Sequence, residues 1–138
     1  MLISGNFHHD GLVADLDLDE LAANDYLADA YGQFSPDGRD HFPVVAAKIL
    51  RMATTEPTLT AADLAQVAAR TLVMAGDDDM VTAEHTLLLY RGITDSELAV
   101  VPGTSHALII EKPDLCNRII LDFLTKDPAT TFMPIRRA

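Results

Sequence analysis

An apolar run that ends in a glycine and three carboxylates constrains the fold of this chain more than any other feature. The run spans Thr71 to Val81, T-L-V-M-A-G-D-D-D-M-V. Its apolar residues do not alternate with polar ones, a pattern typical of a strand covered on both faces, as in the parallel sheets of α/β proteins. The aspartates follow the carboxyl end of this strand. In open α/β sheets that edge is where ligands and catalytic groups are placed.

A second unit of the same kind follows from Glu97 to His106, E-L-A-V-V-P-G-T-S-H, where a short apolar run precedes a histidine. Residues 82–92 between the two units predict a helix, because Thr82 suits its N-cap and Glu84 its first turn. Strand, helix and strand imply a right-handed parallel crossover. We therefore expect an acid and a histidine to meet at one edge of the sheet.

The segments G-D-D-D-M-V and V-P-G-T-S-H-A-L-I-I-E-K-P together resemble the last third of the α/β-hydrolase fold. In that family, a Gly-x-x-Asp after the penultimate core strand supplies the acid of the catalytic triad, and a Gly-x-x-His after the last strand supplies the base. The resemblance implies that Asp79, in the Gly76 motif, is the acid and that His106, in the Gly103 motif, is the base. It covers residues 71–126.

The fold class implied by the resemblance is α/β, a partial α/β-hydrolase fold with a short parallel sheet of about three strands and a helical cap insertion. The 138 residues suffice for one domain with a genuine core. Within it we expect a strand and loop at 1–11, a helical cap at 12–70, a carboxyl-terminal β/α core at 71–126 and a tail at 127–138.

The expected cap carries helical patterns and no strand signal. A second helix is predicted from Asp40 to Met52, with Pro43 in its first turn, and a capping box at 60–63 predicts a short helix to Val67. These helices could instead be crossover helices that cover a sheet face. The first predicted helix has one apolar face, formed by Leu16, Leu18, Leu21, Leu27 and Tyr31.

The sequence holds no G-x-S-x-G elbow for a nucleophile. In this family the order is Ser, Asp, His, and only Ser4 and Ser35 precede Asp79, neither with the elbow's glycines. We therefore expect a truncated hydrolase that retains the acid and the base, has no nucleophile and is inactive alone. The parent activity is serine-type hydrolysis of an ester or related bond without a cofactor. An aspartate nucleophile, as in haloalkane and epoxide hydrolases, is the alternative.

His8 and His9 follow the first predicted strand and are candidates for lining a substrate pocket. Histidines and carboxylates also bind zinc, but adjacent histidines tend to point apart and no zinc motif is present. We therefore expect no metal. A metal-dependent hydrolase using His8, His9, Asp79 and His106 stays as a weaker alternative.

Composition excludes some partners. With a net charge of −11 and no basic stripe, the chain is not expected to bind nucleic acid, and no apolar run approaches the ~18 residues of a membrane span. We expect a cytoplasmic protein without a targeting segment, whose single Cys116 packs in the core. A small molecule is the substrate in the parent family.

The first strand, Met1 to Gly5, is expected to expose a sheet edge that invites a homodimer or a complementing fragment. This edge motivates a second hypothesis, a non-catalytic binding or assembly module derived from a hydrolase.

Overall fold

The computed structural model describes residues 1–14, 20, 23–128 and 131–133. Its strands are β1 (Leu2–Ile3), β2 (Thr71–Gly76) and β3 (Ser96–Val101). They form a parallel sheet in the order β1-β2-β3, with Val73 of β2 in register with Leu2 on one side and Leu98 on the other. The predicted α/β class and short parallel sheet are confirmed.

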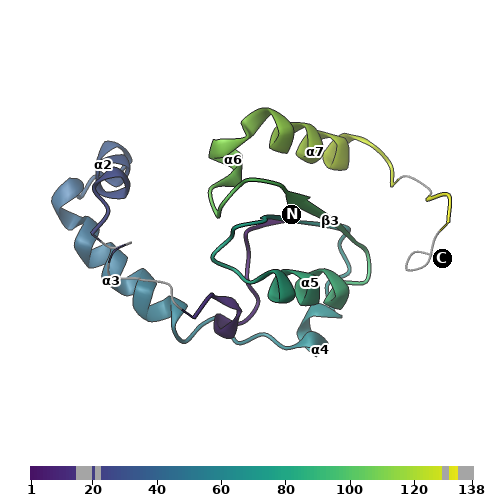
Figure 1. The fold of residues 1–138 in the computed structure, drawn as a ribbon. Helices are drawn as coiled ribbons and strands as arrows, with labels where there is room; N and C mark the ends of the chain where they lie inside the picture. The colour runs from purple at the N-terminus through teal and green to yellow at the C-terminus, as the bar shows by residue number, and fades with distance from the viewer. Residues whose placement is uncertain (15–19, 21–22, 129–130, 134–138) are drawn as a thin grey trace.

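Helices cover both faces of this sheet (Figure 1). On one side lie α4 (Ala61–Leu64) and α5 (Ala83–Gly92), and on the other lie α6 (Leu108–Glu111) and α7 (Pro113–Thr125). Because helices lie on both faces of the sheet, every residue of β2 is buried, which explains why its apolar residues do not alternate with polar ones.

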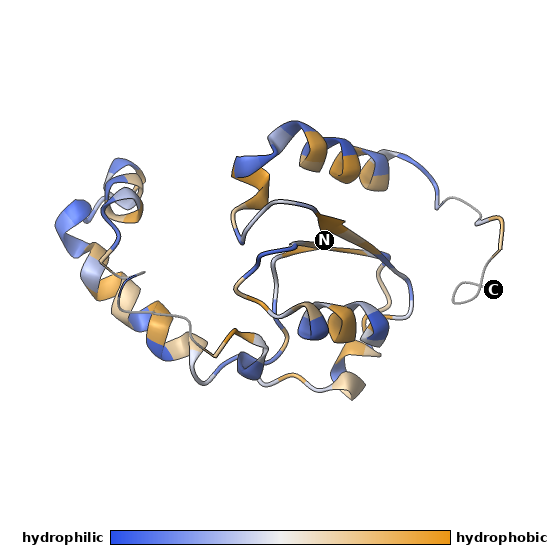
Figure 2. Ribbon diagram, in the orientation of Figure 1, coloured by the Kyte–Doolittle hydropathy of each residue, from blue (hydrophilic) through white to orange (hydrophobic). Residues whose placement is uncertain are grey.

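Each face of the sheet has its own hydrophobic core. Towards α7 the buried residues are Leu72, Met74, Val101, Leu108 and Cys116. Towards α4 and α5 they are Leu64, Val73, Leu89 and Ile93. Hydrophobic and hydrophilic stretches alternate along α5 and α7 (Figure 2), as expected of helices with one face on a core. The predicted packing role of Cys116 is confirmed, since its exposed fraction is 0%.

The segment between β1 and β2 begins with η1 (His9–Gly11) and continues with α2 (Asp25–Phe34), η2 (Arg39–His41) and α3 (Phe42–Ala53). α2 and α3 extend away from the sheet and its covering helices (Figure 1), so they are not crossover helices on a sheet face. The helix predicted from Asp40 to Met52 is found as α3, with Pro43 in its first turn, but α3 begins at Phe42 and Asp40 lies in η2. Three residues of the first predicted helix, Leu16, Leu18 and Leu21, lie outside the described residues.

The predicted caps hold in detail. Thr60 and Asp63 form a reciprocal capping box at the start of α4, and the Thr82 hydroxyl accepts a hydrogen bond from the His85 N–H at the start of α5. α4 ends at Leu64 rather than at the predicted Val67, because the amides of Gln66 and Val67 bond three residues back and tighten the turn. No helix of the described chain has the length and apolar character needed to span a membrane.

Candidate active site

Asp79 lies in the loop after β2, and its side chain is only 2% exposed. One carboxylate oxygen, Oδ1, is 2.8 Å from His106 Nδ1 and accepts from the Val81 N–H at 3.1 Å. The other, Oδ2, accepts from the Ser4 hydroxyl at 2.6 Å and from the Gly76 N–H at 3.4 Å. These donors compensate the cost of burying a carboxylate, which without partners is large.

The pKa of the Asp79 carboxyl is shifted by two opposing effects. Burial raises the pKa, while the hydrogen bonds from Ser4, His106 and the Val81 N–H lower it. The net pKa lies below the ordinary value for aspartate, so the group is an anion at neutral pH. A buried anion is what an acid partner of a catalytic histidine needs to be.

His106 lies in the loop after β3, and its side chain is 44% exposed. Because Nδ1 faces the Asp79 carboxylate, we assign the ring proton to Nδ1 and leave Nε2 as the proton acceptor. Gly103, the second residue of this loop, has a φ of 64°, a left-handed conformation that glycine adopts most readily. The structure thus brings together the two residues that the sequence predicted as base and acid.

The two loops are in close contact at Gly76. A Cβ atom at this position would lie 2.3 Å from the Thr104 carbonyl oxygen and 2.5 Å from that of Ser105. Close approach of the two backbones is therefore the physical reason for a glycine at this position. This approach lets the β2 and β3 loops share one site.

Asp77 joins the same two loops. Its Oδ1 accepts a hydrogen bond from the Thr104 N–H at 3.1 Å, and this bond is the main cause of a pKa below the ordinary aspartate value. The Asp78 N–H in turn donates to the Thr104 carbonyl at 3.1 Å. The N-cap of the next helix is Thr82, whose hydroxyl accepts from the first turn.

Glu111 supports the loop on the other side of His106. Its Oε2 accepts from the Ser105 N–H at 2.7 Å, and its Oε1 accepts from the Ser105 hydroxyl at 2.8 Å. The Ala107 N–H donates to the Ser105 hydroxyl at 3.2 Å. His106 is therefore flanked by two residues whose backbone amides are held by one network.

Ser4 is the site residue that sequence reasoning missed. In the sequence Ser4 is only a nucleophile candidate without the elbow's glycines, whereas the structure directs its hydroxyl to Asp79. The signal was available in principle, because Ser4 directly follows β1 and β1 pairs with β2, so that both strands end at the same edge. Finding it required predicting that β1 lies beside the strand that carries the acid.

The sequence suggested that the side chains of His8 and His9 point apart, but in the structure they do not. Their rings stack with centroids 4.4 Å apart, and each Nδ1 faces the Asp10 carboxylate, at 3.4 Å and 3.0 Å. Of the described residues, these three form the group that could hold a metal ion, with ligand atoms within 4.8 Å of one another. The group does not include Asp79 or His106, so the four-residue metal site is wrong. The role of His8 and His9 in a substrate pocket stays a prediction.

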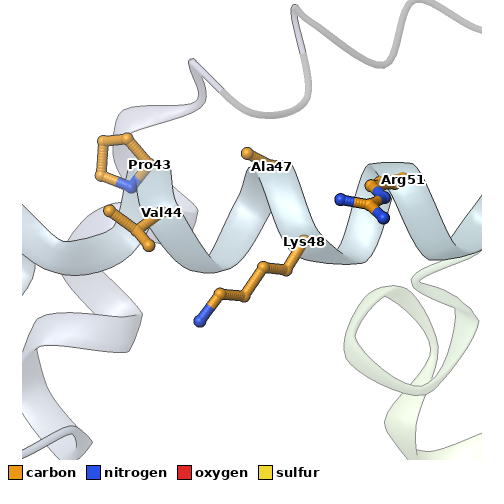
Figure 3. Close-up of a pocket in the computed structure, with 5 residues that line it drawn as sticks. All are labelled: Pro43, Val44, Ala47, Lys48 and Arg51. Carbon is orange, nitrogen blue, oxygen red and sulfur yellow. The ribbon is translucent and has the colours of Figure 1, made fainter.

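Two of the hollows among the described residues lie on α3 and at the β1 side of the sheet, away from this acid–base pair. One groove is formed by α3 alone, with Lys48 and Arg51 beside three apolar residues, Pro43, Val44 and Ala47 (Figure 3). The other lies at the β1 side of the sheet and is lined by apolar residues that include Leu2, Phe7 and Leu64. Neither contains an acid and a histidine.

Comparison with solved structures identifies the fold. An α/β-hydrolase from a deep-sea metagenome library, MGS-M2, matches with a TM-score of 0.62 and 16% identity, over 95% of this chain and 57% of that one. CarC, a serine hydrolase involved in carbazole degradation, matches with a TM-score of 0.58 and 22% identity, over 83% of this chain and 50% of that one. The chain therefore has the fold of about half of an α/β-hydrolase.

Sequence comparison finds curated proteins that are similar to part of the chain. A proline iminopeptidase, PfmaB of Pestalotiopsis fici, is 35% identical over 65 residues, 46% of this chain and 23% of that protein. A 2-hydroxy-6-oxo-6-phenylhexa-2,4-dienoate hydrolase of Burkholderia cepacia is 40% identical over 62 residues, 44% of this chain and 22% of that protein. No family model matches the chain. The chain thus aligns with less than a quarter of these two relatives and with about half of the solved α/β-hydrolases above.

Proposed function

We propose that Asp79 and His106 are the acid and base of a hydrolase that cleaves an ester or related bond, with a nucleophile supplied by a segment outside these 138 residues. The observation that carries the proposal is the 2.8 Å contact between His106 Nδ1 and the buried Asp79 carboxylate. As relatives, the iminopeptidase and the dienoate hydrolase support hydrolysis as the reaction class.

The chemistry follows from the pair. A serine hydroxyl becomes a competent nucleophile when an imidazole accepts its proton, and a carboxylate on the other ring nitrogen stabilises the imidazolium that forms. The partly exposed His106 ring leaves Nε2 available for this transfer. The same nitrogen then returns the proton to the leaving group, which makes one histidine both general base and general acid.

Neither serine that precedes Asp79 in the sequence replaces the nucleophile. The Ser4 hydroxyl donates to the acid rather than to the base, and that of Ser35 accepts from the Asp37 N–H in a surface turn. The chain on its own is therefore proposed to be inactive. It would require the nucleophile elbow of a hydrolase for turnover.

The test is a chimera that joins the half of CarC not matched by this chain to residues 1–138. Hydrolysis of a short-chain aryl ester is measured for the chimera and for the chain alone. We expect turnover only in the chimera. Asp79→Asn or His106→Ala should lower the kcat of the chimera about 10⁴-fold, the effect of replacing one residue of a catalytic triad.

Asp78→Asn and His41→Ala are the matched controls, because Asp78 is the exposed neighbour of the acid and His41 lies at the end of η2. Both should leave kcat within about 2-fold of the parent chimera. Equal turnover in the Asp79→Asn chimera would overturn the proposal. Turnover by the chain alone that disappears in both variants would show that the nucleophile lies within these 138 residues.

A second candidate, a non-catalytic assembly module, is favoured by the edge of the sheet. Among the described residues no strand pairs with the outer side of β1, and the apolar groove lined by Met1, Leu2 and Phe7 lies beside it. An uncovered edge next to an apolar groove is a typical surface for pairing with another chain.

Sedimentation velocity of the purified chain tests this candidate. A stable dimer that dissociates when Leu2→Lys places a charge on the edge would support the module, because inward or edge charges block strand pairing. Ile109→Lys is the control, since that side chain is also exposed but lies on α6. A monomer at all concentrations would count against the module.

A further inference from the structure

Ser4 has an unusual backbone conformation. Its φ is 47°, and it is the one non-glycine residue in the described part of the chain with a positive φ. L-residues other than asparagine and aspartate rarely adopt this left-handed region, and glycine is the residue that normally occupies it. Such a conformation persists where the surrounding structure imposes it, and it is often found at functional sites.

Two hydrogen bonds impose the conformation of Ser4. Its N–H donates to the Met74 carbonyl of β2 at 2.8 Å, which continues the pairing of β1 beyond its last strand residue. Its hydroxyl donates to Asp79 Oδ2 at 2.6 Å. The left-handed turn at Ser4 therefore coincides with the point where β1 reaches the acid.

We propose that Ser4 is a positioning residue of the active site, which fixes the Asp79 carboxylate so that its other oxygen faces His106. This inference rests on the proposed function of that pair. Ser4 itself does not react.

Rotation of the Asp79 carboxylate is the motion that Ser4 restrains. The torsion that turns an aspartate carboxylate is broad, so one hydrogen-bonded oxygen alone does not set its plane. The Gly76 N–H lies 3.4 Å from Oδ2 and is a weak second anchor, whereas the Ser4 hydroxyl at 2.6 Å is a short bond to an anion. Ser4 is thus the main restraint on the oxygen that does not face the histidine.

Two substitutions separate positioning from backbone structure. Ser4→Ala removes the hydroxyl and keeps the unfavourable φ, while Ser4→Gly removes the hydroxyl and relieves it. The Ser4→Gly protein should therefore melt at a higher temperature than the Ser4→Ala protein. If Ser4 positions the acid, both variants lose the same catalytic function despite this difference.

The first readout uses the purified 138-residue chain and needs no turnover. Carboxyl-carbon NMR titration should show the pKa of Asp79 higher in both variants than in the parent chain, because the Ser4 hydroxyl is one of the groups that lower it. Ser35→Gly, in the turn after α2, is the control and should leave the Asp79 titration unchanged. An unchanged Asp79 titration in both Ser4 variants would overturn the inference.

The second readout uses the CarC chimera. We expect kcat for the aryl ester to fall about 10-fold to 100-fold in both Ser4 variants, the range of a hydrogen bond to a charged group, with KM unchanged. Activity retained in Ser4→Gly but lost in Ser4→Ala would assign Ser4 a structural role and overturn the inference. An Asp79→Asn chimera that stays active would instead refute the proposed function itself, which distinguishes the two failures.

Discussion

The sheet with its covering helices and the α2–α3 pair bury their side chains to very different extents. Around the sheet, Met74, Val101 and Leu108 are at most 1% exposed. Within α2 and α3 only Ala28 and Ala46 are buried, whereas Phe34 is 88% exposed and Met52 is 56% exposed. The close-packed region can hold two loops in precise contact, and the helix pair presents apolar surface instead.

The two regions are expected to differ most in the free energy of unfolding that is lost when a glycine is replaced by alanine. Gly76→Ala places a Cβ against backbone oxygens of Thr104 and Ser105, so the base loop must move away from the acid loop. We expect a loss of about 4 kcal/mol or more in the free energy of unfolding, the range of severe steric defects. Urea denaturation of the purified variant measures it.

Gly38→Ala is the matched change in the helix pair. Gly38 has a φ of 75°, but a Cβ there meets nothing within 4 Å. We expect a cost of only about 1 kcal/mol, that of a left-handed alanine. If Gly38→Ala and Gly76→Ala lowered the free energy of unfolding equally, the close contact between the loops at Gly76 would add nothing to the cost of the backbone conformation.

A smaller difference is expected for apolar side chains. Leu108→Ala removes a side chain with 0% exposure from the core beneath α7 and should cost about 3 kcal/mol through lost burial and a residual cavity. Ile49→Ala, in α3, removes a side chain that is 51% exposed and should change stability by about 0.5 kcal/mol or less. Thermal melts of both variants compare the regions directly, and a loss at Ile49 as large as at Leu108 would show that α3 is covered in solution.

The same contrast explains which parts of the fold could be predicted from the sequence. β2 is strongly patterned because every one of its residues is buried. Thr82 and Thr60 indicate the starts of their helices through local capping that needs no tertiary contact. The end of α4 was predicted too far along the chain, since tightening of its last turn leaves little trace in residue type.

At the site, the sequence predicted the acid and the base but not their support. Asp79 and His106 follow strands at the spacing of a known family, which is a local signal. The hydrogen bonds from Ser4 to Asp79 and from the Thr104 N–H to Asp77 depend on which loops meet in space. Their partners are 75 and 27 residues apart in the sequence, respectively. Only the strand order and the close approach at Gly76 bring such partners together, and a local sequence pattern predicts neither.

The smallest expected effect concerns pH and the buried histidine of the sheet region. His85, in α5, is 7% exposed, stacks on Phe7 with ring centroids 4.1 Å apart, and accepts a hydrogen bond from the Phe7 N–H at Nε2. Its pKa is lowered, first by burial and then by the neighbouring His8, so the neutral ring is favoured in the folded state.

The sign of the pH effect follows from this shift. The unfolded chain binds a proton at His85 near its ordinary pKa of about 6.5, while the folded chain resists protonation until lower pH. The contribution of His85 to stability is therefore complete above that value and is lost as pH falls below it. His85→Gln keeps an acceptor for the Phe7 N–H and removes the titration, so its unfolding free energy should fall less between pH 7 and pH 5 than that of the parent chain. His41→Gln, in η2, should retain the parent slope because His85 is still present, and an identical slope in His85→Gln would refute the assignment.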